Sequence, residues 1–288
     1  MWFLLSILCA ISLSTSDAIS KAILRNVDEY LVAFIRYAFS FPFLAIFLFF
    51  IKIPHLDKVF WEVILILQPL EITAILLYIK AIKISPLSLT IPFLSLTPVF
   101  LIFTSFLMLK EVPSLSGAIG IILVAIGAYF LNLKEVKRGI FYPFKAILRE
   151  KGSLFMIIVA FIYSITSNLG KIAIKHSDPI FFSLFFSFIT PIELFPFVVL
   201  KSKNKVTSLL NHKISLSLAG FFFALMILFH NLALIQTNVA YMISVKRTNS
   251  LFSIIYGYIF FKEEEIKTKI LGAVLMLSGV TLIGFNPF

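Results

Sequence analysis

The sequence predicts an all-α membrane protein with ten transmembrane helices in two inverted five-helix repeats. Three observations lead to this prediction: an apolar composition, ten apolar runs of membrane-spanning length, and an internal repeat. Of the 288 residues, 60% are hydrophobic and 14% are charged, and the mean hydropathy is +1.04. Soluble domains carry about 25% charged residues, so this chain is not expected to fold in water.

The apolar runs have the length that a bilayer requires. A transmembrane helix needs about 20 apolar residues, because each residue advances 1.5 Å. The expected spans are residues 2–22, 30–51, 61–80, 87–109, 114–133, 153–174, 179–200, 214–235, 239–261 and 266–285. The first lacks a basic segment and a small-residue cleavage pattern, so we interpret it as a helix and not as a secretory signal. Pro86 supports the division between the third and fourth spans, because proline disfavours helix at the preceding residue.

The two halves of the chain are related in sequence. The longest gap, residues 134–152, is basic and separates residues 1–133 from residues 153–288, with five spans on each side. A shift of 150 residues aligns Ser14 with Ser164, Lys21 with Lys171 and Asp28 with Asp178. A shift of 152 residues aligns Ala81 with Ala233, Lys110-Glu111 with Lys262-Glu263, Gly120 with Gly272 and Gly127 with Gly279. Because five is odd, the second half enters the membrane from the opposite side, which is a transporter architecture.

The charge of +11 lies in the short gaps between apolar runs, whereas nucleic-acid binding needs a basic stripe on a folded surface. We therefore expect no nucleic-acid partner. The gaps on the side of the termini hold 5 lysines, and those on the other side hold 17 lysines and arginines. The positive-inside rule then places both termini outside the cell. Cys9 is the only cysteine, which excludes an intrachain disulfide and a thiolate metal cluster; no metal or cofactor is predicted.

Ionisable side chains deep in the expected spans are the candidate functional residues, because burying a charge in a bilayer costs several kcal/mol unless it faces the bundle interior or water. They are Asp17, Arg36, Glu71, Glu193, Lys246 and Arg247. Helical spacing places three of them, Glu71, Glu193 and Lys246, each in a polar stripe along one helix face. These stripes are Gln68, Glu71 and Tyr78; Ser183, Ser187, Thr190 and Glu193; and Lys246, Asn249, Ser253 and Tyr256. Together they predict a hydrated cavity between the halves.

The alternative is that these groups only hold helices together. Arg36 would then pair with Glu71, and Lys246 or Arg247 with Glu193, as buried ion pairs. Lys246 and Arg247 point about 100° apart, so the two cannot easily share one partner. At least one is expected to meet the cavity or a ligand. His230 aligns with Tyr78 under the second shift, and both a proton-carrying and a structural role stay open for it.

In this arrangement the residues resemble the EamA-type transporters of the drug/metabolite transporter superfamily. The resemblance covers essentially the full chain and is carried by Lys21, by Arg36 in AFIRYAF, by Pro98 in SLTPVF, by Lys110-Glu111, by Lys171, by SVKRTNSLFSIIYGYIFFKEE and by the paired glycines. It implies one EamA-like repeat in residues 1–133, another in residues 153–288, and secondary transport. It also implies that both termini lie in the cytoplasm, whereas the count of lysines and arginines in the gaps places them outside. Ser14-Thr15-Ser16-Asp17 departs from the tryptophan-glycine pair common in the family, so no substrate is transferred from relatives.

We therefore expect a secondary transporter that moves a small polar or zwitterionic metabolite across a prokaryotic inner membrane by alternating access. The expected binding or coupling residues are Arg36, Glu71, Tyr78, Glu193, His230, Lys246, Arg247 and Asn249. The expected partners are the solute, the lipid bilayer, and a proton or counter-substrate. The paired glycines predict a packing seam, with a homodimer contact as the alternative.

Two other classes of function were weighed. For an intramembrane enzyme, the familiar HExxH, GxSxG and GxxxxGK[ST] motifs and a close pair of intramembrane aspartates are missing, so no catalytic residue is predicted. A membrane receptor or scaffold would not need an inverted repeat.

Overall fold

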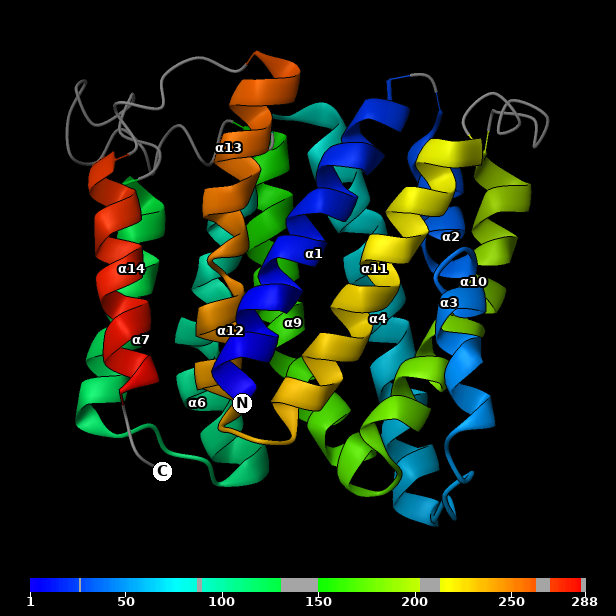
Figure 1. Ribbon diagram of the computed structural model, residues 1–288, viewed down its shortest axis with the longest axis horizontal. Helices are drawn as coiled ribbons and strands as arrows, with labels where there is room; N and C mark the ends of the chain where they lie inside the picture. Colours follow the sequence, from blue (N-terminus) through cyan, green and yellow to red (C-terminus); the bar gives the residue numbers. More distant parts are fainter. Residues whose placement is uncertain (26, 87–89, 131–149, 203–212, 263–269, 286–288) are drawn as a thin grey trace.

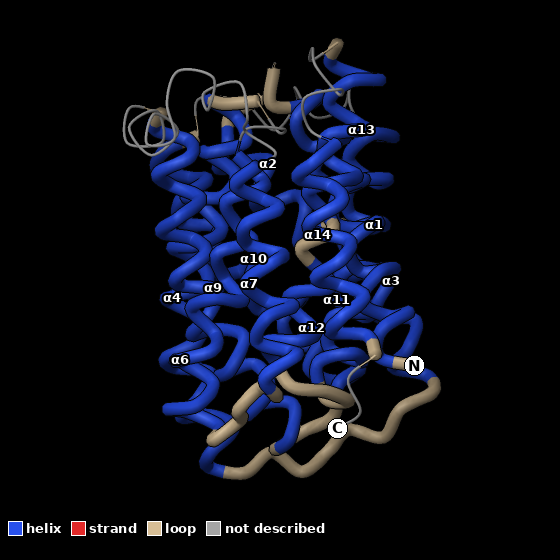
Figure 2. Tube along the Cα trace, turned by 90° about the vertical axis from the view of Figure 1, so that its left-hand side faces the viewer, coloured by secondary structure: helices blue, strands red, loops and turns tan. Residues whose placement is uncertain are grey.

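The computed structural model describes residues 1–25, 27–86, 90–130, 150–202, 213–262 and 270–285, and these residues form helices without a strand. The helices stand side by side as a bundle (Figure 1), and a view at right angles shows the same arrangement (Figure 2). The predicted linker, residues 134–152, lies outside the described residues except for its last three.

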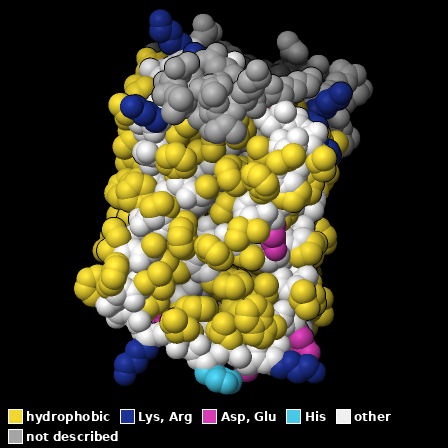
Figure 3. All heavy atoms as spheres, turned by 90° about the vertical axis from the view of Figure 1, so that its right-hand side faces the viewer, with side chains coloured by type: hydrophobic (Ala, Val, Ile, Leu, Met, Phe, Trp, Pro, Cys, Tyr) yellow, Lys and Arg dark blue, Asp and Glu magenta, His cyan; other side chains and the backbone are white. Residues whose placement is uncertain are grey.

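Six helices are long and apolar enough to cross a membrane: Trp2–Ile23, Glu29–Phe49, Lys58–Ile84, Lys151–Lys175, Pro179–Lys201 and Lys213–Leu234. Five of them are α1 (Trp2–Ile23), α4 (Lys58–Ile84), α9 (Lys151–Lys175), α10 (Pro179–Lys201) and α11 (Lys213–Leu234). The sixth consists of α2 (Glu29–Ala38), α3 (Phe41–Ala45) and η1 (Ile46–Phe49). On the face that Figure 3 shows, hydrophobic side chains cover most of the middle and basic ones lie at the two ends, as lipid requires. The protein is thus an all-helical, multi-pass membrane protein.

Shorter helices complete the described fold. They are η2 (Ile91–Leu96), α6 (Thr97–Leu109), α7 (Leu115–Phe130), α12 (Val239–Lys246), α13 (Asn249–Phe261) and α14 (Ile270–Gly284). Residues 239–261 therefore form two helices, α12 and α13, and not one continuous helix. The Thr248 hydroxyl donates to the Val245 carbonyl and the Ser250 hydroxyl to the Arg247 carbonyl, each at 2.8 Å. Such local bonds compete with the helical ladder, and they place Arg247 at the break.

Residues that the two shifts align occupy matching structural positions. Asp28 caps α2 by accepting a hydrogen bond from the Leu31 N–H group, and Asp178 caps α10 by accepting from Ile180 and Phe181. Lys110 and Lys262 end α6 and α13 with φ angles of 58° and 54°. They are the non-glycine residues with positive φ in the described part of the chain.

The halves are interleaved. Helix α1 packs along α11, α4 packs along α9, and α7 packs against α14 at one edge of the bundle (Figure 1). A Cβ atom on Gly120 would lie 2.7 Å from the Gly279 carbonyl oxygen, and one on Gly127 would lie 2.7 Å from that of Gly272. These glycines therefore form a close packing seam within the chain, as predicted.

Hydrogen bonds at one end of the bundle fix the direction of the first helix of each half. The Lys21 ammonium at the end of α1 donates to the Ser85 carbonyl at 2.6 Å, just past α4. The Ser85 hydroxyl donates to Glu150, which caps the start of α9 by accepting from the Ser153 N–H group. The end of α1 and the beginning of α9 thus meet, so these two helices run in opposite directions.

Candidate functional site

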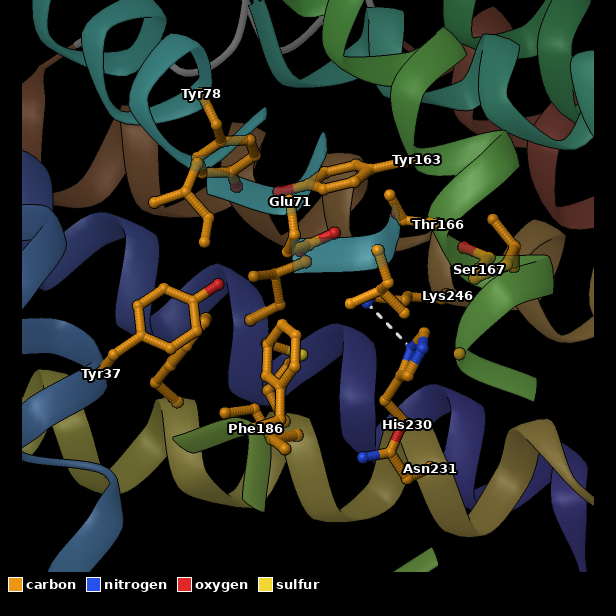
Figure 4. Close-up of a pocket in the computed structure, with 18 of the residues that line it drawn as sticks. Tyr37, Glu71, Tyr78, Tyr163, Thr166, Ser167, Phe186, His230, Asn231 and Lys246 are labelled. Carbon is orange, nitrogen blue, oxygen red and sulfur yellow. Dashed lines mark hydrogen bonds between the residues drawn. The ribbon is translucent and has the colours of Figure 1, made fainter. Parts of the chain in front are cut away.

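A cavity of about 120 Å³ lies in the centre of the bundle, lined by α1, α2, α4, α9, α10, α11 and α12. One water needs about 10–15 Å³ measured in this way, so the cavity holds several waters or a small solute. Figure 4 shows its wall: Tyr37, Glu71, Tyr78, Tyr163, Thr166, Ser167, Phe186, His230, Asn231 and Lys246. The wall combines phenyl and phenol rings with charged and amide groups.

Both halves contribute equivalent positions to this cavity. The lining includes six pairs that the two shifts align: Leu13 and Tyr163, Arg36 and Phe186, Glu71 and Phe223, Ile75 and Ile227, Tyr78 and His230, and Ile79 and Asn231. The cavity therefore lies between the halves. The charges are unevenly shared, because the first half supplies Arg36 and Glu71 where the second supplies phenylalanines.

Arg36 is bound to an aspartate in the cavity wall. Its Nη1 atom lies 2.8 Å from Oδ1 of Asp17, and the two side chains are 3% and 0% exposed. The Tyr78 hydroxyl donates to the other Asp17 oxygen, and the guanidinium carbon lies 4.1 Å from the centre of the Phe223 ring. The alternative pairing of Arg36 with Glu71 is thus wrong. The Glu71 carboxylate is not bound by Arg36 and remains available to the cavity.

Glu71 is the one carboxylate among the residues that line the cavity. Thr166 of α9 lines the same cavity. No lysine, arginine or histidine nitrogen lies within ion-pair distance of Glu71 in the part of the chain that the structure describes. Its charge is therefore available to a solute.

Two adjacent cations face the same cavity without a carboxylate partner. The Lys246 ammonium lies 3.0 Å from Nδ1 of His230, as Figure 4 shows, and it can donate to that atom only when the atom carries no proton. The Arg247 side chain is 2% exposed, and its Nη2 atom donates to the Thr97 hydroxyl at 2.9 Å. Neither cation forms an ion pair with a described acidic residue.

Two of the predicted site residues do not line the cavity. Glu193 lies on α10 outside the lining, and neither Lys246 nor Arg247 pairs with it. Asn249 follows the break after α12 and packs on α1, where its carbonyl accepts from the Ser14 hydroxyl at 2.6 Å. The α10 hydroxyls bond to carbonyls of their own helix: Ser183 to Pro179, Ser187 to Leu184 and Thr190 to Phe186. None of these three hydroxyl residues lines the cavity.

Sequence reasoning missed part of the wall. Tyr163, Thr166, Ser167 and Gly170 of α9 line the cavity, and their spacing of i, i+3, i+4 and i+7 places them on one helix face. That spacing was the signal that could have found them. Tyr37 and Phe186 carried no such signal, because aromatic residues occur throughout the spans.

The charges that reach the cavity leave one positive charge uncancelled. Lys246 and Arg247 supply two positive charges, Glu71 supplies one negative charge, and Arg36 is cancelled by Asp17. Such a wall offers two cations to a carboxylate and one carboxylate, Glu71, to an ammonium group. No group of three or more histidine, cysteine, aspartate or glutamate side chains in the described residues could hold a metal ion.

Comparisons with known proteins agree with this architecture. The EamA-like transporter family matches the sequence over residues 1–133 and 150–285. No curated protein matches it. A solved structure described only as "Crystal structure of protein" is similar with a TM-score of 0.73 and 13% identity, covering 96% of this chain and 94% of that one. At that identity the likeness shows the fold.

Proposed function

Because this chain belongs to the EamA-like transporter family, within the drug/metabolite transporter superfamily, we propose that it carries a small zwitterionic metabolite across the membrane by alternating access. The observation that carries the proposal is the separation of charge in the cavity, where Lys246 and Arg247 lack a carboxylate and Glu71 lacks a cation. A zwitterion supplies both missing partners. Its apolar part would lie against Tyr37, Phe186 and Phe223.

Alternating access needs two similar halves of opposite orientation. We therefore propose ten spans in two inverted five-helix repeats, in which η2 with α6, α7, α12 with α13, and α14 cross the membrane besides the six long helices. The matching caps of Asp28 and Asp178, the opposite directions of α1 and α9, and the equivalent residues around the cavity support this proposal.

Each residue of the proposed site has its own role. Lys246 and Arg247 bind the carboxylate of the solute, and Glu71 binds its ammonium group. His230 holds Lys246 in position through their contact at 3.0 Å. Tyr78 holds the cavity wall in position through its hydrogen bond to Asp17. Arg36 belongs to the wall, while Glu193 and Asn249 lie outside the cavity lining. A proton or a counter-substrate is the proposed coupling partner, and membrane fractionation of a prokaryotic host tests the proposed inner-membrane location.

Transport of amino acids by the purified protein in proteoliposomes tests the proposed function. We expect exchange of neutral α-amino acids with no chemical change in the solute. An amino acid should compete at least about tenfold better than the matching amine or carboxylic acid, because each analogue leaves one buried charge unpaired. An amine or acid that competes as well as the amino acid would contradict the proposal. Binding without flux would favour a receptor, and chemical conversion an enzyme.

A further inference from the structure

Asp17 is a charged group that lies next to the proposed site without lining the cavity. It is fully buried behind the cavity wall and is not a lining residue, whereas its partners Arg36 and Tyr78 both line the cavity. We propose that Asp17 is a positioning residue that sets the solute charge the cavity accepts, by cancelling Arg36. This inference rests on the proposed function, since it concerns the selectivity of the same cavity.

The geometry shows why Arg36 does not bind solute as a free cation. Asp17 from α1 contacts Nη1 of Arg36 from α2 at 2.8 Å and accepts a hydrogen bond from Tyr78 of α4. The guanidinium lies against the Phe223 ring of α11. Four helices thus hold the arginine in one place, with a carboxylate behind it and aromatic rings beside it.

The charge balance then decides between solutes. With Asp17 present, the charges of Arg36, Lys246, Arg247, Asp17 and Glu71 add to a net +1. Without the Asp17 charge the net charge is +2, and Arg36 joins Lys246 and Arg247 as a third buried cation without a carboxylate partner among the described residues. A solute with a second carboxylate would then be favoured, because buried cations bind carboxylates strongly and are costly when unpaired. Asp17 thereby lowers the preference of the cavity for a solute with a second carboxylate, because it leaves Arg36 with a partner.

Glutamine and glutamate are a suitable pair of probes, since they have nearly the same shape and differ by one carboxylate. Uptake of both is measured in proteoliposomes with the parental protein and with Asp17→Asn. We expect the ratio of glutamate to glutamine uptake to rise at least about tenfold in the variant. A ratio that does not rise, including the case in which neither solute enters, overturns the proposal.

The double variant Asp17→Asn/Arg36→Gln separates charge from packing. It removes both members of the pair and returns the sum to +1, so the uptake ratio should return to within about twofold of the parental value. A purely structural pair would give no shift of the ratio in either variant. Asp17→Ser replaces the asparagine variant if thermal unfolding shows that the latter does not fold.

Failure of this inference differs from failure of the proposed function. Neutral amino acids that enter parental proteoliposomes, together with an unchanged ratio in Asp17→Asn, overturn the role of Asp17 alone. A parental protein that transports no amino acid overturns the zwitterion proposal, whatever the variants do.

Discussion

Replacing Arg247 by glutamine is expected to lower transport about 100-fold at low solute concentration, with little change in stability. The guanidinium faces the cavity without a carboxylate partner, and its described polar contact is the Thr97 hydroxyl. Removing one member of a buried charge pair, here the protein's partner of the solute charge, costs about 2–5 kcal/mol of binding free energy. A loss of about 2.7 kcal/mol corresponds to a 100-fold change in affinity. The folded protein loses no ion pair. Lys246→Gln should act in the same direction.

Transport in proteoliposomes and thermal unfolding in detergent measure these two effects. Lys58→Gln is the matched control, because its side chain is 89% exposed and far from the cavity lining; its transport should stay within about twofold of the parent. Parental transport rates in both Lys246→Gln and Arg247→Gln would show that the binding role is wrong. Stability lost in proportion to activity would favour the structural alternative.

Glu111→Ala is expected to destabilise the protein by about 3–5 kcal/mol, the usual result of stranding one member of a buried ion pair. The Lys171 ammonium lies 2.5 Å from one Glu111 oxygen, and the Val239 N–H group donates to the other at 2.9 Å. Glu111 thus has two roles. It pairs with a lysine that is about 5% exposed, and it caps the start of α12. Its loss removes a link between the two halves of the chain.

Glu62→Ala provides the comparison for this change. Glu62 pairs with Lys58 at 3.3 Å, but the two side chains are 57% and 89% exposed, so its removal should change stability by less than about 1 kcal/mol. Thermal or denaturant unfolding of both variants gives the result. Equal, small losses would show that the Glu111 pair is not a buried link.

The sequence predicted much of the fold because span length and repeats are local and periodic properties. It also identified six charged or titratable groups on the cavity: Arg36, Glu71, Tyr78, His230, Lys246 and Arg247. It did not predict whether Asp17 or Glu71 pairs with Arg36. Both acids lie on helices that neighbour α2, and only the packing of α1 against α2 decides between them. Lys171 was counted as a loop charge, yet it is buried against Glu111.

Glu193 illustrates a different limit. Helical spacing placed it with Ser183, Ser187 and Thr190 on one face of α10, and none of these four residues lines the cavity. Phe182 and Phe186 of the same helix line it instead, because the spacing groups residues on a face but the packing of neighbouring helices decides which face meets the cavity. The break after Lys246 was hidden because hydroxyl groups, and not glycine or proline, interrupt the helix there.

The structure of the protein with a transported amino acid bound tests the central claim most directly. The account predicts solute density in the cavity between the halves, with the solute carboxylate within hydrogen-bond distance of Lys246 or Arg247 and its ammonium group within that distance of Glu71. A transported solute bound outside this cavity, or one in the cavity that contacts none of these three side chains, would contradict it.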